Sequence, residues 1–243
     1  MTNDLTLIIG ANSEIAKAIA SLVCDKAQLI VISRDVSFYQ HQLFESAVCI
    51  TVPDYSEASI VEVVSQMRGQ MKDSAIRRVF VCHGVLHNDA CFPERKLEDL
   101  STDSFSQIMT SNAITPLLWL KHLVPLIHSK HSCKLTFFSA RVGSIGDNHL
   151  GGWYSYRASK AALNMLLKSA AIELARRAKN VKLISFHPGT TQSPLSKPFA
   201  KNVPPAKLFT PHFVAEKLLE IVDNSSVDGK LSYVDWQGKN IPW

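Results

Sequence analysis

The sequence predicts an α/β protein in which a doubly wound parallel sheet carries helices on both faces. Short apolar runs rich in β-branched residues recur along the chain, as expected of strands buried on both sides. Segments with helical periodicity separate these runs from the first residues onward, and this alternation favours a parallel sheet. The chain has 243 residues, 46% of them hydrophobic, which is enough for one well-buried core.

The strand-like runs all end at a residue suited to a turn or at a polar residue. In chain order they are residues 5–9, 29–33, 48–52, 79–82, 135–138, 181–186 and 231–234. The helical patterns lie between them and include two long segments in the second half of the chain. They are residues 15–23, 56–71, 101–128, about 153–179 and 213–222. Pro116 and Pro125 are expected kinks in the third helix.

Charge and cysteine content exclude several classes of protein. The net charge of +5 is mild, and the basic pairs, such as Arg77-Arg78, lie at expected element ends, so nucleic-acid binding is not expected. Five cysteines without a Cys-x-x-Cys pair predict free thiols in a reducing compartment and no metal site. We find no signal peptide and no apolar run of membrane-spanning length, so a cytoplasmic protein without a membrane partner is expected.

The segment from Pro188 to Pro211 contains six prolines and no clear periodicity. A loop of this length inside a compact domain is more often a functional lid than a linker. Too little chain remains beyond it to form a second domain. We therefore expect one domain, residues 1–243, with a substrate loop at about 190–211.

The helical stretch that begins near residue 153 contains Tyr156 and Lys160. Four residues apart on a helix, their side chains lie on one face, one turn apart. A nearby ammonium favours the phenolate form of a tyrosine, whose pKa is otherwise about 10. Moving that pKa close to neutrality requires roughly 4 kcal/mol, which a partly dry cleft can supply. The pair is thus a candidate acid/base device, although an exposed helix face explains the spacing equally well.

Taken together with the element order, these residues resemble the short-chain dehydrogenase/reductase family. The resemblance runs from the first strand to the last, and residues 151–164 are especially similar to small carbonyl reductases of the C-factor (C-signal) type. It implies a Rossmann-like fold, a nicotinamide dinucleotide, and a catalytic set of Ser, Tyr, Lys and Asn. Tyr156, Lys160 and Asn112 stand at three of these positions. Asn112 would open a helical hydrogen bond and hold a water of the proton relay.

The serine of this set departs from the family pattern. The usual Ser-Ser-x-x-Gly appears here as Ser139-Ala140-Arg141-Val142-Gly143, which puts Ala140 at the catalytic position. Ser139 could replace the missing hydroxyl, and Ser144 is a second candidate. We assign the role to Ser139 as an expectation. Loss of the hydroxyl would remove roughly 1.5–3 kcal/mol of transition-state stabilisation.

The resemblance also implies a cofactor site along the carboxyl ends of the strands. Its expected residues are Gly10, Asn12, Ser13, Glu14, Ile15, Arg34, Asp54, His83, Gly84, Tyr156, Lys160, Pro188, Gly189, Thr191 and Ser193. Only the first glycine of the family's first turn is present, and Glu14 must point away from the pyrophosphate if the backbone is to bind it. His83 is interpreted as a wall residue rather than a ligand, and Asp54 either bonds the adenine or serves a turn.

Arg34 follows the second strand, at the position where the family distinguishes its two cofactors. An arginine there can pair with a 2′-phosphate, whereas an acid accepts from the ribose 2′-hydroxyl. The neighbouring Asp35 complicates the choice, and we favour NADP(H) over NAD(H). The implied function is hydride transfer between NADP(H) and a small carbonyl or alcohol substrate. The alternative is a cofactor-binding regulatory or signalling protein with weak or no catalysis. A homodimer or homotetramer is expected from the resemblance alone.

Overall fold

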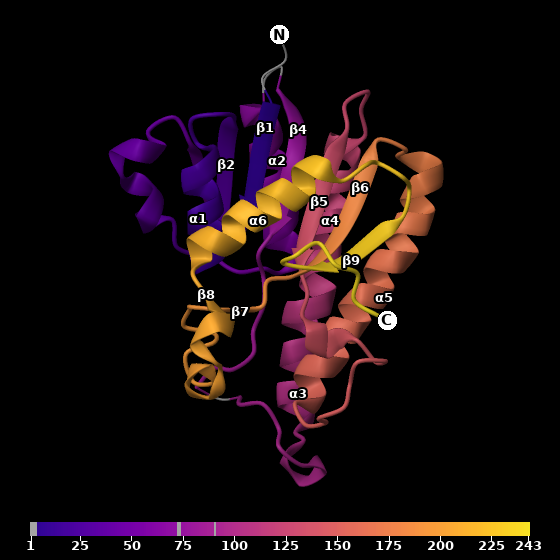
Figure 1. The fold of residues 1–243 in the computed structure, drawn as a ribbon. Helices are drawn as coiled ribbons and strands as arrows, with labels where there is room; N and C mark the ends of the chain where they lie inside the picture. The colour runs from indigo at the N-terminus through magenta and orange to yellow at the C-terminus, as the bar shows by residue number, and fades with distance from the viewer. Residues whose placement is uncertain (1–3, 72–73, 90) are drawn as a thin grey trace.

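The computed structural model describes residues 4–71, 74–89 and 91–243, and in them a seven-stranded parallel sheet forms the centre of the molecule (Figure 1). Its strand order is β3-β2-β1-β4-β5-β6-β9, with every neighbouring pair parallel. The strands are β1 (Asp4–Ile9), β2 (Gln28–Ser33), β3 (Val48–Thr51), β4 (Ala75–Val81), β5 (Cys133–Phe138), β6 (Val181–His187) and β9 (Leu231–Asp235). The predicted fold class is confirmed.

Helices cover both faces of this sheet. They are α1 (Glu14–Val23), α2 (Glu57–Gln70), α3 (Thr102–Met109), α4 (Thr115–Ile127), α5 (Tyr154–Arg177) and α6 (Pro211–Asn224). Apolar residues of α2, α4 and α5 pack on one face, and those of α1 and α6 pack on the other. Along β1 the alternation assigns Leu7 and Ile9 to the first core and Ile8 to the second. Burial on both faces explains why the strands read as continuous apolar runs.

Two departures from the expected elements concern strand and helix boundaries. Arg77 and Arg78 lie inside β4 rather than at its end, because the ion pairs of Arg77 with Asp4 and of Arg78 with Asp223 accommodate both charges. The third expected helix is divided into α3 and α4 by a π-helical turn, Thr110–Ile114. The proline Pro116 lies in the first turn of α4, where it is tolerated, so it is not the cause of the interruption.

The proline-rich segment contains two short strands, β7 (Thr190–Thr191) and β8 (Leu208–Phe209), which pair in parallel. Their pairing closes the segment onto itself at its two ends. In Figure 1 this segment lies beside the carboxyl ends of the main strands. Among the described residues, none of the helices combines the length and apolar character needed to cross a lipid bilayer.

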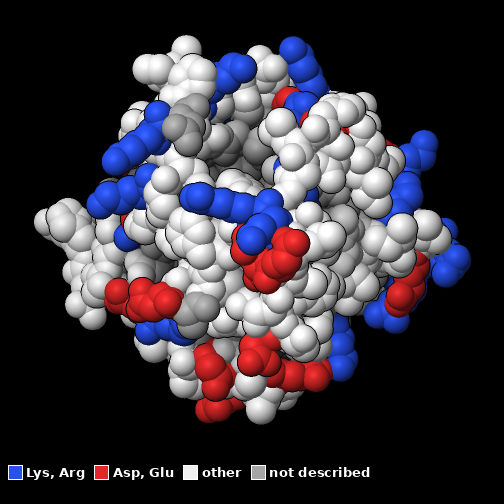
Figure 2. Space-filling view, turned by 90° about the horizontal axis from the view of Figure 1, so that it is seen from below, with Lys and Arg blue, Asp and Glu red and all other residues white. Residues whose placement is uncertain are grey.

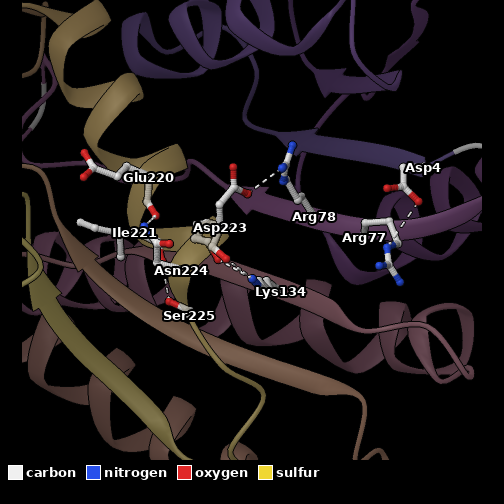
Figure 3. A network of polar contacts seen from close by, with 10 residues as sticks. Asp4, Arg77, Arg78, Lys134, Glu220, Ile221, Asp223, Asn224 and Ser225 are labelled. Atoms are coloured by element: carbon white, nitrogen blue, oxygen red, sulfur yellow. Dashed lines mark hydrogen bonds and ion pairs between the residues drawn. The ribbon is translucent and has the colours of Figure 1, made fainter.

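At the opposite end of the sheet, a polar network holds the C-terminus of α6 (Figure 3). The ammonium of Lys134, on β5, donates to the carbonyl oxygens of Val222 (2.6 Å) and Asp223 (2.9 Å). Arg78, on β4, pairs with the Asp223 carboxylate at 2.6 Å. The last carbonyls of a helix have no intrahelical donor, and a cation is favourable there. Two strands thereby fix the end of a helix that is packed on the sheet.

Replacing Lys134 with methionine should destabilise the protein by about 1–2 kcal/mol, because two carbonyls lose a charged donor. For a chain of this size the melting temperature should fall by roughly 2–8 °C. Thermal unfolding measured by circular dichroism tests this expectation, with Lys130→Met, at an exposed position, as the control. Equal melting temperatures for the Lys134 variant and the wild type would show that the capping contributes nothing.

Candidate functional site

The site lies where the carboxyl ends of the parallel strands meet, the usual position for ligands in such sheets. Figure 2 views the molecule from this end, and a hollow opens there with Lys and Arg side chains around it. Turns after β1, β4, β5 and β6 and the first turns of α5 all reach this region. Residues far apart in the sequence are therefore brought to one edge.

Tyr156 and Lys160 extend from consecutive turns of α5 and are both buried, at 9% and 2% exposure. The Lys160 ammonium lies 5.7 Å from the centre of the Tyr156 ring and donates to the Phe138 carbonyl at the end of β5, at 2.8 Å. Gly84 approaches the same ammonium, because a Cβ added there would lie 3.5 Å from it. The two residues are thus buried where α5 meets the carboxyl end of β5, and they do not lie on an exposed helix face.

Burial sets the protonation of this pair. It raises the pKa of the Tyr156 phenol above its ordinary value and lowers the pKa of Lys160 to about 7. In both cases desolvation disfavours the charged form. Without a ligand, the tyrosine is therefore a protonated acid, and the lysine is close to half charged at neutral pH.

Asn112 is fully buried within the π-helical turn. Its amide accepts from the Val85 N–H (2.7 Å) and donates to the Val85 carbonyl (2.8 Å) and to the Ser159 hydroxyl (3.0 Å). The turn displaces the helical hydrogen-bond ladder, since the Thr115 N–H donates to the Thr110 carbonyl. Asn112 thereby joins the loop after β4 to α5. Its contact on α5, Ser159, lies between Tyr156 and Lys160 in sequence.

The two serine candidates have hydrogen-bond partners other than the tyrosine. The Ser139 hydroxyl donates to Asn164 Oδ1 at 2.9 Å, an atom that also accepts from Ser185. Ala140 is extended and packs in one apolar cluster with Tyr156, so the adjacent Ser139 side chain points to the opposite side. The Ser144 hydroxyl accepts from the Asp147 N–H and serves a turn. The residue against the tyrosine is therefore Ala140.

The turn from β1 to α1 has the shape of an anion site. Gly10 has a φ of +72°, and a Cβ there would lie 3.2 Å from the Cys82 carbonyl carbon, so only glycine fits between the two strand ends. Ser13 caps α1 by accepting from the Ala16 N–H. The first-turn N–H groups of Glu14 and Ile15 have no acceptor within the helix and can bind a phosphate. Asn12 lies between Gly10 and this helix start.

The carboxylate of Glu14 pairs with Lys17 at 2.9 Å, one turn along the same helix. It is therefore directed along the helix surface, which is the orientation that backbone binding of a pyrophosphate requires.

Beyond β2, Arg34 lies over the ring of Tyr55, with its guanidinium carbon 5.6 Å from the ring centre. The carboxylate of Asp35 is used locally, since it accepts from the Ser37 N–H (2.9 Å) and from the Asn12 side chain (3.4 Å). Of the two adjacent charges, the arginine has no carboxylate partner in the described part of the chain. It is thus available to an anionic ligand.

The Asp54 carboxylate accepts from the Ser56 N–H and the Ser59 hydroxyl at the start of α2. These bonds lower its pKa, and they give the residue a local structural use.

His83 is enclosed at the end of β4, edge-to-face with Tyr55 at 4.2 Å. Burial, with the positive charges of Arg34 and Lys160, lowers its pKa to about 3. The ring is therefore neutral, and its Nε2 has no partner among the described residues. No cluster of three or more potential metal ligands occurs in the described ranges either. The geometry is that of a wall residue with one unused polar atom.

The turn after β6 runs from Pro188 through Gly189, whose φ is +72°. A Cβ on Gly189 would lie 2.6 Å from the Phe209 ring, so the glycine lets β8 pack against the turn. The Ser193 hydroxyl bonds the Thr191 carbonyl at 3.3 Å. The Thr191 hydroxyl is buried without a partner among the described residues. Like the unused His83 nitrogen, it is a polar atom that a ligand amide could satisfy.

Aromatic rings cover the tyrosine. Trp153 lies 6.2 Å from Tyr156 and 4.9 Å from Phe199, between ring centres. Phe199 in turn contacts Phe92 at 5.4 Å and His87 at 5.8 Å. We call these four residues, His87, Phe92, Trp153 and Phe199, the aromatic cover.

Not all apolar side chains of the neighbouring loops belong to the cover. Ile145 and Leu150, which precede Trp153 in the chain, are 79% and 92% exposed.

Two features of the site were not found in the sequence. Gly143 packs against α5 so closely that a Cβ would lie 2.7 Å from Lys160 Cβ. Glu94, in the irregular segment after β4, is buried and bonds Ser155 at the start of α5. Gly143 stood in the aligned motif, but its contact with Lys160 is a tertiary one. Nothing in the local pattern around Glu94 distinguishes it from a surface acid.

Several proteins with related sequences or folds are named as dehydrogenases or reductases. 1-Hydroxy-2-glutathionyl-2-methyl-3-butene dehydrogenase of Rhodococcus sp. (strain AD45) is 26% identical over 98% of each chain. C-signal of Myxococcus xanthus is 28% identical over 60% of this chain and 83% of its own length. The NADPH-bound carbonyl reductase from chicken fatty liver superposes with a TM-score of 0.83 over the full length of both chains, at 20% identity. Because only 20% of the residues are identical, the superposition establishes the similarity of fold alone.

The sequence model of the short chain dehydrogenases matches residues 4–204, which include every candidate catalytic and cofactor-contact residue described above. The parallel sheet, the turn after β1 and the Tyr-x-x-x-Lys pair on α5 agree with that match. This chain belongs to the short-chain dehydrogenase/reductase family of oxidoreductases.

Proposed function

We propose that this protein reduces a small, uncharged carbonyl compound with NADP(H), and catalyses the reverse oxidation of the alcohol. One observation carries the proposal. Tyr156 and Lys160 lie together, buried at the carboxyl ends of the strands, with the phenol protonated. When bound, the cofactor supplies the hydride. Family membership supports the reaction class.

In the proposed mechanism Tyr156 donates its proton to the developing alkoxide. Burial raises the pKa of this phenol, opposite to the lowering that Lys160 was expected to cause, so the phenol holds its proton before the reaction and its donation depends on stabilisation of the phenolate. Lys160 in its charged form stabilises the phenolate that results. Within the described residues the Tyr156 hydroxyl forms no hydrogen bond, so it is available to a substrate oxygen. Asn112 anchors the loop after β4 to α5 and keeps the pair in register.

The turn after β1 and the turn after β6 are the proposed cofactor contacts. Gly10, Asn12, Ser13, Glu14 and Ile15 would hold the pyrophosphate through backbone groups, with the Glu14 carboxylate turned to Lys17. Pro188, Gly189, Thr191 and Ser193 would hold the nicotinamide amide, and His83 and Gly84 would line the adjoining wall. The unused Thr191 hydroxyl and His83 nitrogen support the fit, because both need a polar partner.

NADP(H) is favoured because no described carboxylate pairs with Arg34, while Asp35 already accepts hydrogen bonds from Ser37 and Asn12. A guanidinium can form two parallel bonds to a 2′-phosphate. Asp54 would reach the adenine only with the part of its carboxylate that α2 does not use.

The aromatic cover supports an apolar, uncharged substrate. Its four side chains carry no permanent charge, and Leu86 and Ala140 complete the apolar surface around Tyr156. Ser139 would orient the carbonyl only by leaving Asn164, so in this geometry apolar packing does more of that work than the expected hydroxyl.

A second function from a different class is a cofactor-binding regulatory protein with weak catalysis. Ala140 is the observation that favours it, since the family's hydroxyl is absent beside the tyrosine. A thermal shift with NADPH but no turnover on a panel of aldehydes and ketones would favour this function over the first.

We further propose that the whole chain acts as one nicotinamide-binding unit in the cytoplasm and assembles as a homodimer or homotetramer. The apolar side chains of Met165 and Ile172 on α5 are 66% and 52% exposed and could join two copies. Leu163 and Leu167 of the same helix belong to the internal core and do not contribute to such a surface.

Replacing Tyr156 with phenylalanine should lower kcat for NADPH-dependent carbonyl reduction by about 10²–10⁴-fold, because the proton donor is lost. Folding and NADPH affinity should stay unchanged. Steady-state kinetics together with a thermal shift measure these quantities, and Tyr154→Phe, two residues earlier on the same helix, is the control. Turnover at the wild-type rate in the Tyr156 variant would refute the mechanism.

Replacing Lys160 with methionine should raise the stability of the cofactor-free protein while abolishing activity. The folded pKa of about 7 lies below the unfolded value of 10.5, so the unfolded chain binds more protons between these values. The loss of folding stability caused by the buried lysine is therefore largest below pH 7 and disappears as the pH rises toward 10. The variant should be more stable by roughly 1–4 kcal/mol at pH 6.

Melting temperatures of the Lys160 variant and the wild type, measured from pH 6 to pH 10, test this expectation. The difference between them should shrink steadily as the pH rises, whereas Lys179→Met, at an exposed position beyond the C-terminus of α5, should give no such trend. A difference that is absent or independent of pH would contradict the assigned protonation.

Replacing Arg34 with alanine should raise KM for NADPH by about 10–100-fold and leave KM for NADH unchanged, because only the 2′-phosphate loses a partner. Kinetics with both cofactors measure the two constants, and Arg68→Ala on α2 serves as the charge control. A wild-type enzyme that prefers NADH, or equal effects on both cofactors, would show that Arg34 does not select NADP(H).

A further inference from the structure

The start of α5 lacks a cap of its own. Trp153 precedes the helix in the left-handed region, with a φ of 55°, and provides no side-chain cap. The first turn has no acidic residue. The N–H groups of this turn have no intrahelical acceptor, and yet Tyr156 is the third residue of the helix. Something outside the helix must fix the position of its first turn.

Glu94 supplies the missing acceptors from a segment 61 residues earlier in the chain. Its two carboxylate oxygens lie 3.2 Å and 3.4 Å from the Ser155 nitrogen, and one of them also accepts from the Ser155 hydroxyl. Its backbone carbonyl accepts from the Trp153 N–H at 2.6 Å. Side chain and backbone of one residue thus bind both ends of the Trp153–Ser155 segment.

The carboxylate is buried in a place where a charge is costly. Glu94 is 4% exposed, and within the described part of the chain no ion pair involves it. Its compensation comes from the Ser155 donors and from the positive end of the α5 dipole. A carboxylate held this way constrains geometry strongly, because any displacement of the helix start leaves it without donors.

We propose that Glu94 is a positioning residue that fixes the first turn of α5 and, through it, the place of Tyr156 relative to Lys160 and Trp153. The inference rests on the proposed function only for its kinetic consequence. The structural consequence, a helix start held by Glu94, stands independently. Glu94 touches neither reacting residue directly, and it acts through Ser155 and Trp153.

The test combines kinetics with hydrogen exchange on Glu94→Ala, Glu94→Gln and Asp99→Ala. Asp99 is the matched control, because its carboxylate bonds the Arg95 and Lys96 N–H groups in the same segment without reaching α5. Glu94→Ala should lower kcat for carbonyl reduction at least tenfold with less than a twofold change in NADPH affinity. Glu94→Gln, which keeps one acceptor, should recover part of that loss.

Exchange of the amides in residues 153–158 should be at least tenfold faster in Glu94→Ala and unchanged in Asp99→Ala. Exchange at the wild-type rate in the Glu94 variants overturns the proposal whatever the kinetics show. An inactive wild-type protein overturns only the proposed function, since exchange still reports on the helix start. Should Glu94→Ala fail to fold, wild-type exchange and kcat in the isosteric Glu94→Gln would overturn the proposal alone.

Discussion

The burial of the Lys160 ammonium at the carboxyl ends of the strands is the constraint on which the site depends. A buried cation needs acceptors and space, and the Phe138 carbonyl at the end of β5 provides the acceptor. Gly143 allows the chain after β5 to pack on the helix at this residue, because a Cβ there would lie 2.7 Å from Lys160 Cβ, whereas a Cβ on Gly84 would be in ordinary contact with the ammonium at 3.5 Å. The depressed pKa of Lys160 shows that this environment is not optimised for stability. Such an unfavourable burial of a titratable group is typical of sites where the chemistry requires a charge shielded from water.

Around the lysine, polar bonds between distant segments hold each loop of the site. Asn112 ties the loop after β4 to α5, and Glu94 ties the following segment to the first turn of the same helix. Asn164, farther along α5, accepts from Ser139 and Ser185 at the ends of β5 and β6. One helix therefore forms buried hydrogen bonds with four separate parts of the chain. This explains how a site built largely from loops can hold a defined geometry.

The sequence predicted the architecture well and the loop details poorly, for a physical reason in each case. Because β1 is buried on both faces, most of its residues are apolar, and this pattern can be recognised from the sequence alone. The resemblance implied an opened helical hydrogen bond at Asn112, and a π-helical turn is found there, whereas the bonds of Asn112 to Val85, 27 residues away, are tertiary contacts that the local pattern does not reveal. The proline-rich segment is ordered by the pairing of Thr190–Thr191 with Leu208–Phe209, which is again a contact between its two ends.

By itself, the sequence determined the fold class, the family and the Tyr156 and Lys160 pair, because periodicity and motif spacing are local properties of the chain. Only the tertiary structure decided which side chains face that pair. Ala140 packs on Tyr156 while Ser139 turns to Asn164, a choice set by the alternation of an extended chain against its neighbours. Glu94 became a candidate for the same reason. Its distance in sequence from α5 hides a contact that exists only once the sheet has assembled and brought the loop after β4 to the helix start.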